Sequence, residues 1–304
     1  MITRRRLLQG AGGLILGSTA FAGYAVAIEP GYMLDVTRYR ISPRAWPSDL
    51  ALKIAIIADI HACEPFMSAA RVRKIAETAN AMQPDLIVLL GDFNGGHRFA
   101  SGPVMPDEWG EALSVLKAPL GVHSILGNHD WWHGPLPNMK ADGAEGVRRA
   151  LKAMGASVLE NDAIRIDNDG KPFWVAGLGD QLARRVGRHQ FRGMDDLSAT
   201  LTQVTDAAPV VLLAHEPNVF HRLPDRVAVT LCGHTHGGQV NLPVVGPVVG
   251  NERFGPDLVY GHTVHGDRHI VISAGLGTSI VPVRFMRPPE IVELTIVGRP
   301  AVSA

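Results

Sequence analysis

The chain has 304 residues, of which 46% are hydrophobic and 19% are charged. A chain of this length can bury most of its apolar surface around one large core, so a single folded domain is the simplest expectation. Lysine and arginine together number 29, as do aspartate and glutamate, so no net basic field exists to recruit nucleic acid nonspecifically.

The first predicted element is an N-terminal segment, residues 1–27, with the features of an export signal. Arginines at positions 4–6 precede a Gly- and Ala-rich apolar run through Phe21, which is followed by the small-residue pattern Ala-Val-Ala at 25–27. The paired arginines followed by two leucines resemble a twin-arginine signal. This resemblance implies the twin-arginine export machinery as a partner and an exported location, periplasmic or membrane-associated on the extracytoplasmic side. An uncleaved anchor is the alternative, because the apolar run is about as long as a bilayer-spanning helix, although its glycines favour the signal.

After an expected N-terminal extension at 28–49, the chain alternates apolar, β-rich runs with amphipathic segments. Strands are expected over residues 53–58, 85–90, 121–126, 209–214 and 227–232, a helix over 67–82, and shorter strands over 163–177 joined by an Asn-Asp-Gly turn. A polar cluster follows each of the five named strands, which is where α/β sheets place ligand sites. A Gly- and Pro-rich stretch, residues 237–255, is expected to be a long surface loop.

The polar clusters carry Asp, His and Asn in a fixed order. They are Asp59-Ile60-His61, Gly91-Asp92, Gly127-Asn128-His129-Asp130, His215, and Gly233-His234-Thr235-His236-Gly237-Gly238. A lone Asp-x-His is weak evidence, because strand alternation alone puts both side chains on one face. Five clusters at strand ends predict a site for two adjacent divalent metal ions, which can bind a phosphoryl group and activate a water. Mixed oxygen and nitrogen donors fit Mn, Fe, Zn or Co and do not choose among them.

This ordered set resembles the calcineurin-like metallophosphoesterase superfamily, whose pattern runs D-x-H, G-D, G-N-H-D/E, H, then G-H-x-H. The resemblance covers about residues 50–296 and implies a metallophosphoesterase domain over 50–304. Its implied fold is α/β, a four-layer α/β/β/α sandwich of two mixed sheets flanked by helices. The Gly-His-Thr-His-Gly-Gly-Gln form, the leader, and the closing Gly-Leu-Gly-Thr at 275–278 with Pro-Pro-Glu at 288–290 look most like the bacterial exported phosphodiesterase branch.

The resemblance also implies a role for each site residue. Asp59, His61 and His236 would bind one metal, Asn128, His215 and His234 would bind the other, and Asp92 would bridge both with one carboxylate oxygen to each. A metal-bridging hydroxide would attack phosphorus, and His129 would protonate the leaving group as general acid. Asp130 would orient the His129 imidazole and raise its basicity.

Several neighbouring residues carry open alternatives. Trp131, Trp132 and His133 are expected either to line the substrate mouth or to pack in the core. Cys63 and Cys232 are expected to be small buried core residues rather than metal ligands or a disulfide. The apolar residues of the 237–255 loop could receive an acyl chain or a membrane surface, and packing against the body is the favoured alternative.

The predicted function is a dinuclear metal-dependent phosphoesterase, a phosphodiesterase or pyrophosphohydrolase rather than a monoesterase. Its substrate is expected to be a lipid or nucleotide phosphodiester, with no specific nucleic acid partner. The alternative is a catalytically silent binding module that retains the fold, but such modules lose ligands and here every ligand persists. A metallohydrolase of non-phosphate esters or lactams usually reads H-x-H-x-D-H, whereas His236 is followed by Gly-Gly-Gln.

Overall fold

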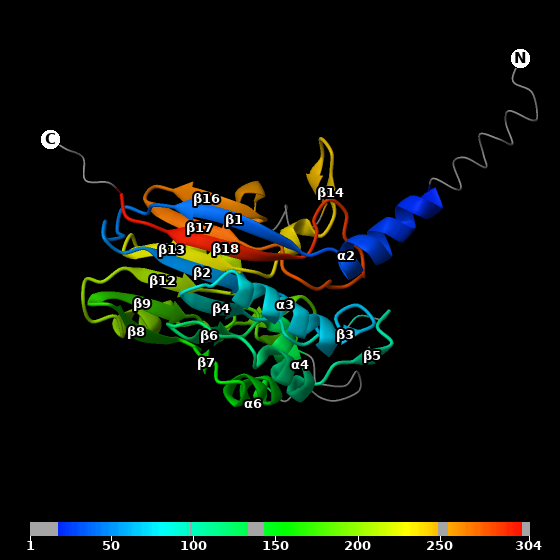
Figure 1. Cartoon of the computed structure of the whole chain (residues 1–304), viewed down its shortest axis with the longest axis horizontal. Coiled ribbons are helices and arrows are strands. Elements are labelled where there is room, and N and C mark those ends of the chain that lie inside the picture. The colour runs from blue at the N-terminus through cyan, green and yellow to red at the C-terminus, as the bar shows by residue number, and fades with distance from the viewer. Residues whose placement is uncertain (1–17, 96, 98, 133–142, 249–254, 300–304) are drawn as a thin grey trace, which may run out of the picture.

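A computed structural model describes residues 18–95, 97, 99–132, 143–248 and 255–299. Two six-stranded mixed sheets lie face to face, and helices cover the outer face of each (Figure 1). The predicted four-layer α/β/β/α sandwich is confirmed.

The first sheet has the strand order β1-β18-β2-β4-β6-β7. Its strands are β1 (Asp35–Ile41), β18 (Glu290–Ile296), β2 (Leu52–Ile57), β4 (Leu86–Leu90), β6 (Val122–Ile125) and β7 (Ser157–Val158). The second sheet has the order β16-β17-β13-β12-β9-β8. Its strands are β16 (Gly261–His265), β17 (Arg268–Ile272), β13 (Val227–Cys232), β12 (Val210–Leu213), β9 (Lys171–Gly177) and β8 (Asp162–Asn168).

Alternate side chains of the central strands face two different cores. Ile54 and Val88 of the first sheet pack against Val211 and Leu231 of the second, while Ile57 and Leu89 face the outer helices. Burial on both faces explains why these strands read as continuous apolar runs in the sequence.

Helices α3 (Ala69–Ala81), α4 (Pro106–Leu113) and α6 (Glu145–Ala153) supply side chains to the outer core of the first sheet. The 3-10 helix η2 (Pro217–Arg222), with η4 (Pro256–Leu258) and α7 (Leu197–Thr202), covers the second sheet. The remaining short elements are α5 (Asn128–Trp132), η3 (His236–Gly238), β3 (Cys63–Glu64), β5 (Gly102–Pro103), β10 (Arg184–Gly187), β11 (Gln190–Arg192), β14 (Asn241–Leu242) and β15 (Gly246–Pro247).

The expected extension at 28–49 is built into the first sheet. Strand β1 pairs in parallel with β18, and Trp46 is buried in the core between the sheets. Residue 50 is therefore not a structural boundary.

Part of the predicted leader also contacts the body. Helical conformation runs over residues 18–32 and includes the π-helical η1 (Tyr24–Ile28) and α2 (Glu29–Tyr32). The Phe21 ring packs edge-on against the Phe285 ring at 4.7 Å, and the Ala25 carbonyl accepts the main-chain N–H of Arg284. The arginines at 4–6 lie outside the described residues. Among the described helices, none is both long enough and apolar enough to cross a membrane.

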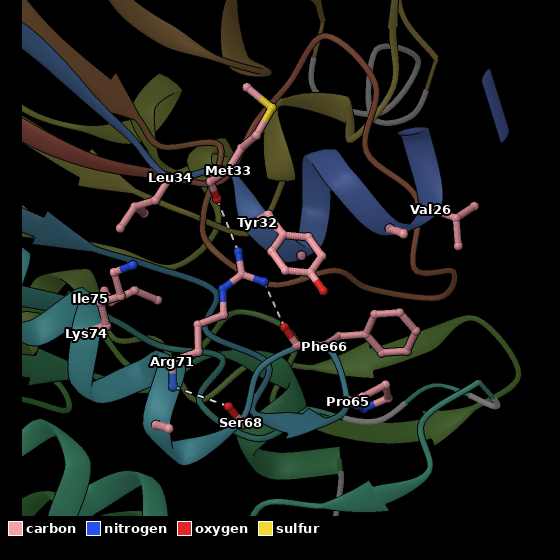
Figure 2. Close-up of a pocket in the computed structure, with 13 residues that line it drawn as sticks. Val26, Tyr32, Met33, Leu34, Pro65, Phe66, Ser68, Arg71, Lys74 and Ile75 are labelled. Carbon is pink, nitrogen blue, oxygen red and sulfur yellow. Dashed lines mark hydrogen bonds between the residues drawn. The ribbon is translucent and has the colours of Figure 1, made fainter. Parts of the chain in front are cut away.

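The other side of this helix borders a largely apolar pocket of about 600 Å³ in front of α3 (Figure 2). The Arg71 guanidinium lies in it and donates to the main-chain oxygens of Pro30, Met33 and Phe66. These bonds fix the end of the helix to the body, so the chain enters the first sheet at a defined angle.

Candidate metal centre

The seven expected ligands all follow strands whose carboxyl ends lie on one side of the two sheets. Asp59 and His61 follow β2, Asp92 follows β4, Asn128 opens α5 after β6, His215 follows β12, and His234 and His236 follow β13. Five of them have positive φ, between 46° and 70°: Asp59, His61, Asp92, His234 and His236. This conformation is uncommon for residues other than glycine, and strained backbone of this kind clusters at functional sites.

The first cluster consists of Asp59, His61 and His236, all buried. The Nε2 atoms of His61 and His236 lie 3.0 Å apart, and Asp59 Oδ1 is 3.6 Å from His236 Nε2. The Asp59 carboxylate is held by the main-chain N–H of His234 at 2.9 and 3.1 Å. Three atoms able to bind a cation therefore converge in one small volume.

The second cluster consists of Asp92, His215 and His234, with Asn128 beside it. His215 Nδ1 lies 2.7 Å from the Leu90 carbonyl, to which it donates, so Nε2 is the ring atom that faces the site. Asn128 Oδ1 lies 2.8 Å from His234 Nδ1. Carboxylate, amide and imidazole donors thus meet again within reach of one ion.

One oxygen of Asp92 joins the two clusters. Asp92 Oδ2 lies 3.5 Å from His61 Nε2 and 3.2 Å from His215 Nε2. Asp92 Oδ1 instead accepts the main-chain N–H of His129 at 2.8 Å. The expected arrangement, with one carboxylate oxygen for each metal, is therefore corrected, since Oδ2 alone faces both clusters.

Burial and the charges of neighbouring residues together set the pKa values of the centre. Burial raises the pKa of Asp59 to about 7. Burial alone would also raise the pKa of Asp92, but the nearby imidazoles of His215 and His129 hold it well below its usual range. Burial would lower the pKa of His215, yet Asp92 holds it well above its ordinary value. Buried charges in proteins are paired or bind metals, so these carboxylates suit cations.

His129 borders the two clusters and is half-buried. Its ring stands edge-on to the His61 ring at 4.7 Å, and its Nε2 lies 3.4 Å from the Ser279 hydroxyl. An imidazole in this place can exchange a proton with a group bound between the clusters.

Asp130 has contacts other than those expected. Its carboxylate accepts four main-chain N–H groups, those of Asp92, Phe93, Asn94 and Gly127. These bonds bind the loop after β4 to the loop after β6. Asp130 therefore fixes the main chain that carries Asp92 and Asn128, whereas the sequence predicted a bond to the His129 imidazole.

Gly127 and Gly275 allow this close packing. A Cβ on Gly127 would lie 2.3 Å from Asp92 Oδ1, and one on Gly275, where φ is +67°, would lie 2.6 Å from the Asp59 Cβ. Any other residue would displace a ligand.

Arg284 is a buried residue of the centre that the sequence did not indicate. Its guanidinium donates to the carbonyls of Ala274, Gly275 and Gly277, and Nη2 lies 3.4 Å from His236 Nδ1. Burial lowers its pKa to about 10, so it remains a cation at neutral pH. Because it lies in a Pro-Val-Arg-Phe stretch that resembles a surface loop, only its burial identifies it.

Two further buried acids, Asp180 and Glu216, were also missed. With His215 they form a third group of potential ligand atoms. Burial and the proximity of Glu216 raise the pKa of Asp180 well above its usual value. The one indication of this group in the sequence is that Glu216 directly follows His215.

The neighbouring aromatic residues divide between core and rim. Trp131 is buried in the core of the first sheet. Trp132 is half-buried, stacks on Phe191 at 5.1 Å and lies 5.5 Å from the His129 ring, so it borders the centre. His133 lies outside the described residues.

The two cysteines are confirmed as free, buried residues, with thiol pKa values raised by burial. Neither belongs to the ligand clusters found among the described residues.

Comparisons with known proteins show which family the chain resembles. Residues 52–266 match the family model described as calcineurin-like phosphoesterase. The uncharacterized metallophosphoesterase YkuE of Bacillus subtilis is 30% identical over 97% of this chain and 98% of its own. The phosphodiesterase YaeI of Escherichia coli is 31% identical over 98% of this chain and 100% of its own. The UDP-2,3-diacylglucosamine pyrophosphatase LpxG of Chlamydia trachomatis is 25% identical over 88% of this chain and 90% of its own.

Proposed function

Because this chain belongs to the calcineurin-like phosphoesterase family and is a metal-dependent phosphoester hydrolase, we propose that it works with two divalent ions that share Asp92. Asp59, His61 and His236 hold one ion, and Asn128, His215 and His234 hold the other. The observation that carries the proposal is the position of Asp92 Oδ2 between His61 Nε2 and His215 Nε2.

The bound ions supply Lewis acidity toward the phosphoryl oxygens and an activated water. The protein contributes the remaining steps. His129 donates a proton to the departing alkoxide, since its half-buried ring faces the clusters. Asp130 and Gly127 keep the two loops close enough for Asp92 to serve both clusters.

The proposed substrates are phosphodiesters or pyrophosphate linkages, on a lipid or a nucleotide. One relative is named a phosphodiesterase and another a UDP-diacylglucosamine pyrophosphatase, which supports both bond types. We further propose that the protein is exported by the twin-arginine route and acts outside the cytoplasm, on the strength of residues 1–27.

The test is hydrolysis of bis-p-nitrophenyl phosphate by the full chain with added Mn²⁺, Fe²⁺, Zn²⁺ or Co²⁺. We expect turnover with at least one metal, loss on chelation and recovery on adding the metal back. Asp92→Asn should reduce both turnover and the number of bound ions, because one oxygen serves both clusters. A protein that binds metal yet hydrolyses no phosphoester with any of them would instead be the silent binding module.

A further inference from the structure

Three segments at one end of the molecule form a single apolar surface. They are the β14–β15 hairpin, the loop that precedes β18, and the helix over residues 18–32, which lie close together in Figure 1. Phe285 joins them: its main chain bridges to Val240 at the base of the hairpin, and its ring contacts the rings of Phe21 and Tyr24.

The exposed side chains of this surface are almost all apolar. They are Leu242, Val244, Val245 and Val248 on the hairpin, Ile280, Val281 and Met286 on the loop, and Phe21, Tyr24 and Ile28 on the helix. The favoured expectation that the hairpin residues pack against the body is therefore wrong for the described part of the loop. Contiguous exposed apolar surface of this kind marks a site of interaction.

Val244 is held at the hairpin tip against its conformational preference. It is fully exposed and has φ 71°, a region that costs a β-branched residue about 1–3 kcal/mol. Glycine or asparagine would fold there more easily. Packing within the described body does not account for a valine in this position, because its side chain is fully exposed.

The base of the surface reaches the metal centre. Gln239, three residues after His236, accepts the main-chain N–H of Ser279 through Oε1. The Ser279 hydroxyl lies 3.4 Å from His129 Nε2. Gln239 and Ser279 therefore connect the base of the apolar surface to His129.

Two observations favour a lipid bilayer as the partner. The hairpin residues 241–248 carry no charge, and the sequence leading into the helix is uncharged from Leu7 to Ala27. Tyr24 and Tyr32 are exposed on the helix, and tyrosine is enriched where a protein crosses from lipid to water.

We propose that this surface docks on a lipid bilayer and presents the metal centre to phosphodiesters in lipid headgroups. Apolar side chains at such a surface enter the boundary between headgroups and acyl chains. The docking stands on the exposed residues of the hairpin and of the loop before β18, which remain in place if residues 1–27 are removed on export. The choice of substrate rests on the proposed function.

The first experiment measures contact with lipid in the full chain. Cysteine is introduced by Val244→Cys, or by Val264→Cys as a matched exposed control on β16, and is labelled with an environment-sensitive fluorophore. Cys63 and Cys232 are buried, so the label goes to the new thiol. In vesicles of phosphatidylcholine and phosphatidylglycerol with brominated chains, we expect quenching at position 244 to exceed that at 264 by about twofold or more. Equal quenching at positions 244 and 264 would overturn the docking. So would a label at position 244 that a second copy of the chain already covers before lipid is added.

The second experiment separates docking from catalysis. The double change Val244→Asn, Val245→Asn should leave the melting temperature equal or higher, because asparagine tolerates left-handed φ. It should leave hydrolysis of bis-p-nitrophenyl phosphate unchanged and lower hydrolysis of vesicle phosphatidylglycerol by about tenfold. Val264→Asn should change neither rate.

If the protein cleaves bis-p-nitrophenyl phosphate but no vesicle lipid, the proposed lipid substrate is wrong. The quenching experiment still decides whether the surface docks on a bilayer. If the wild-type protein cleaves neither, the proposed function fails independently. If the double change lowers the melting temperature and both activities, Val244 and Val245 stabilise the fold, and the proposal is overturned.

Discussion

His129 differs from the proposed metal ligands because its imidazole is half-buried and its main-chain N–H donates to Asp92 Oδ1. His129→Ala keeps that N–H and should retain the bound metal. Loss of the general acid should lower turnover by about 10²–10⁴-fold on an alkyl phosphodiester, whose leaving group needs a proton. On p-nitrophenyl esters the loss should be much smaller. Metal content and turnover on the two substrates, compared with the exposed-site control His221→Ala, measure this, and an equal loss on both substrates would contradict the role.

Strand pattern and residue type predicted the five polar clusters, because each follows an apolar strand, and the family resemblance implied which seven of their residues are ligands. Strand pattern and residue type could not predict residues whose role depends on their being buried by tertiary packing. Arg284 and Asp180 lie in stretches whose composition is typical of surface loops. Only the tertiary packing around them buries their side chains. The role expected for Asp130 was inferred from its position next to His129, whereas its partners are the N–H groups of a neighbouring loop.

At the level of elements, the helix over residues 18–32 and the loop before β18 support each other. The Glu29 carboxylate accepts the main-chain N–H groups of Met286 and Arg287 at 3.0 and 2.6 Å, and Arg284 lies in the same loop. Arg284 in turn holds the carbonyls of the segment that packs against Asp59. The N-terminal helix therefore contributes to the position of the first ligand cluster.

Glu29→Gln should destabilise the protein by about 1–3 kcal/mol, because a buried charge-assisted bond pair is weakened. Metal affinity should fall with it. Glu77→Gln is the matched control, since Glu77 is exposed and, among the described residues, pairs with Arg73 on the helix surface, a contact worth about 0.5 kcal/mol or less. Urea unfolding and metal titration of both variants provide the measurement. Equal stability of the two variants would show that the helix merely rests on the body.

The elements were predicted well where both faces of a strand are buried. Strands β2, β4, β6, β12 and β13 and helix α3 lie within two residues of their expected ends. Strand β1 was missed because it is a half-exposed edge strand whose charged residues read as an extension. Its partner β18 lies far away in sequence, and no local pattern reveals such a pairing.

For the molecule as a whole, metal binding should depend on pH. Burial raises the pKa of Asp59 to about 7, and Asp92 holds the pKa of His215 well above its usual value. The metal-free protein therefore keeps protons on both groups below about pH 7, and metal ions must displace them. Burial lowers the pKa of His236 well below its usual value, so that ligand is already neutral.

Affinity should accordingly rise with pH, with a dissociation constant for Mn²⁺ at least about tenfold weaker near pH 6 than near pH 8. Titration calorimetry in two buffers of different ionisation enthalpy would count the protons released. An affinity independent of pH, or no proton release near pH 6, would contradict this account.

The position of β18 also governs when the protein can fold. This last strand lies between β1 and β2, so that Asp35 faces Glu290 and Leu52 faces Ile296. While the chain is still emerging from the ribosome, no strand bridges β1 and β2. One edge of β2 therefore has no paired strand. Pairings between such distant segments form slowly. The first sheet is thus completed only after β18 has emerged, and chaperones have a long interval in which to shield its uncovered edge.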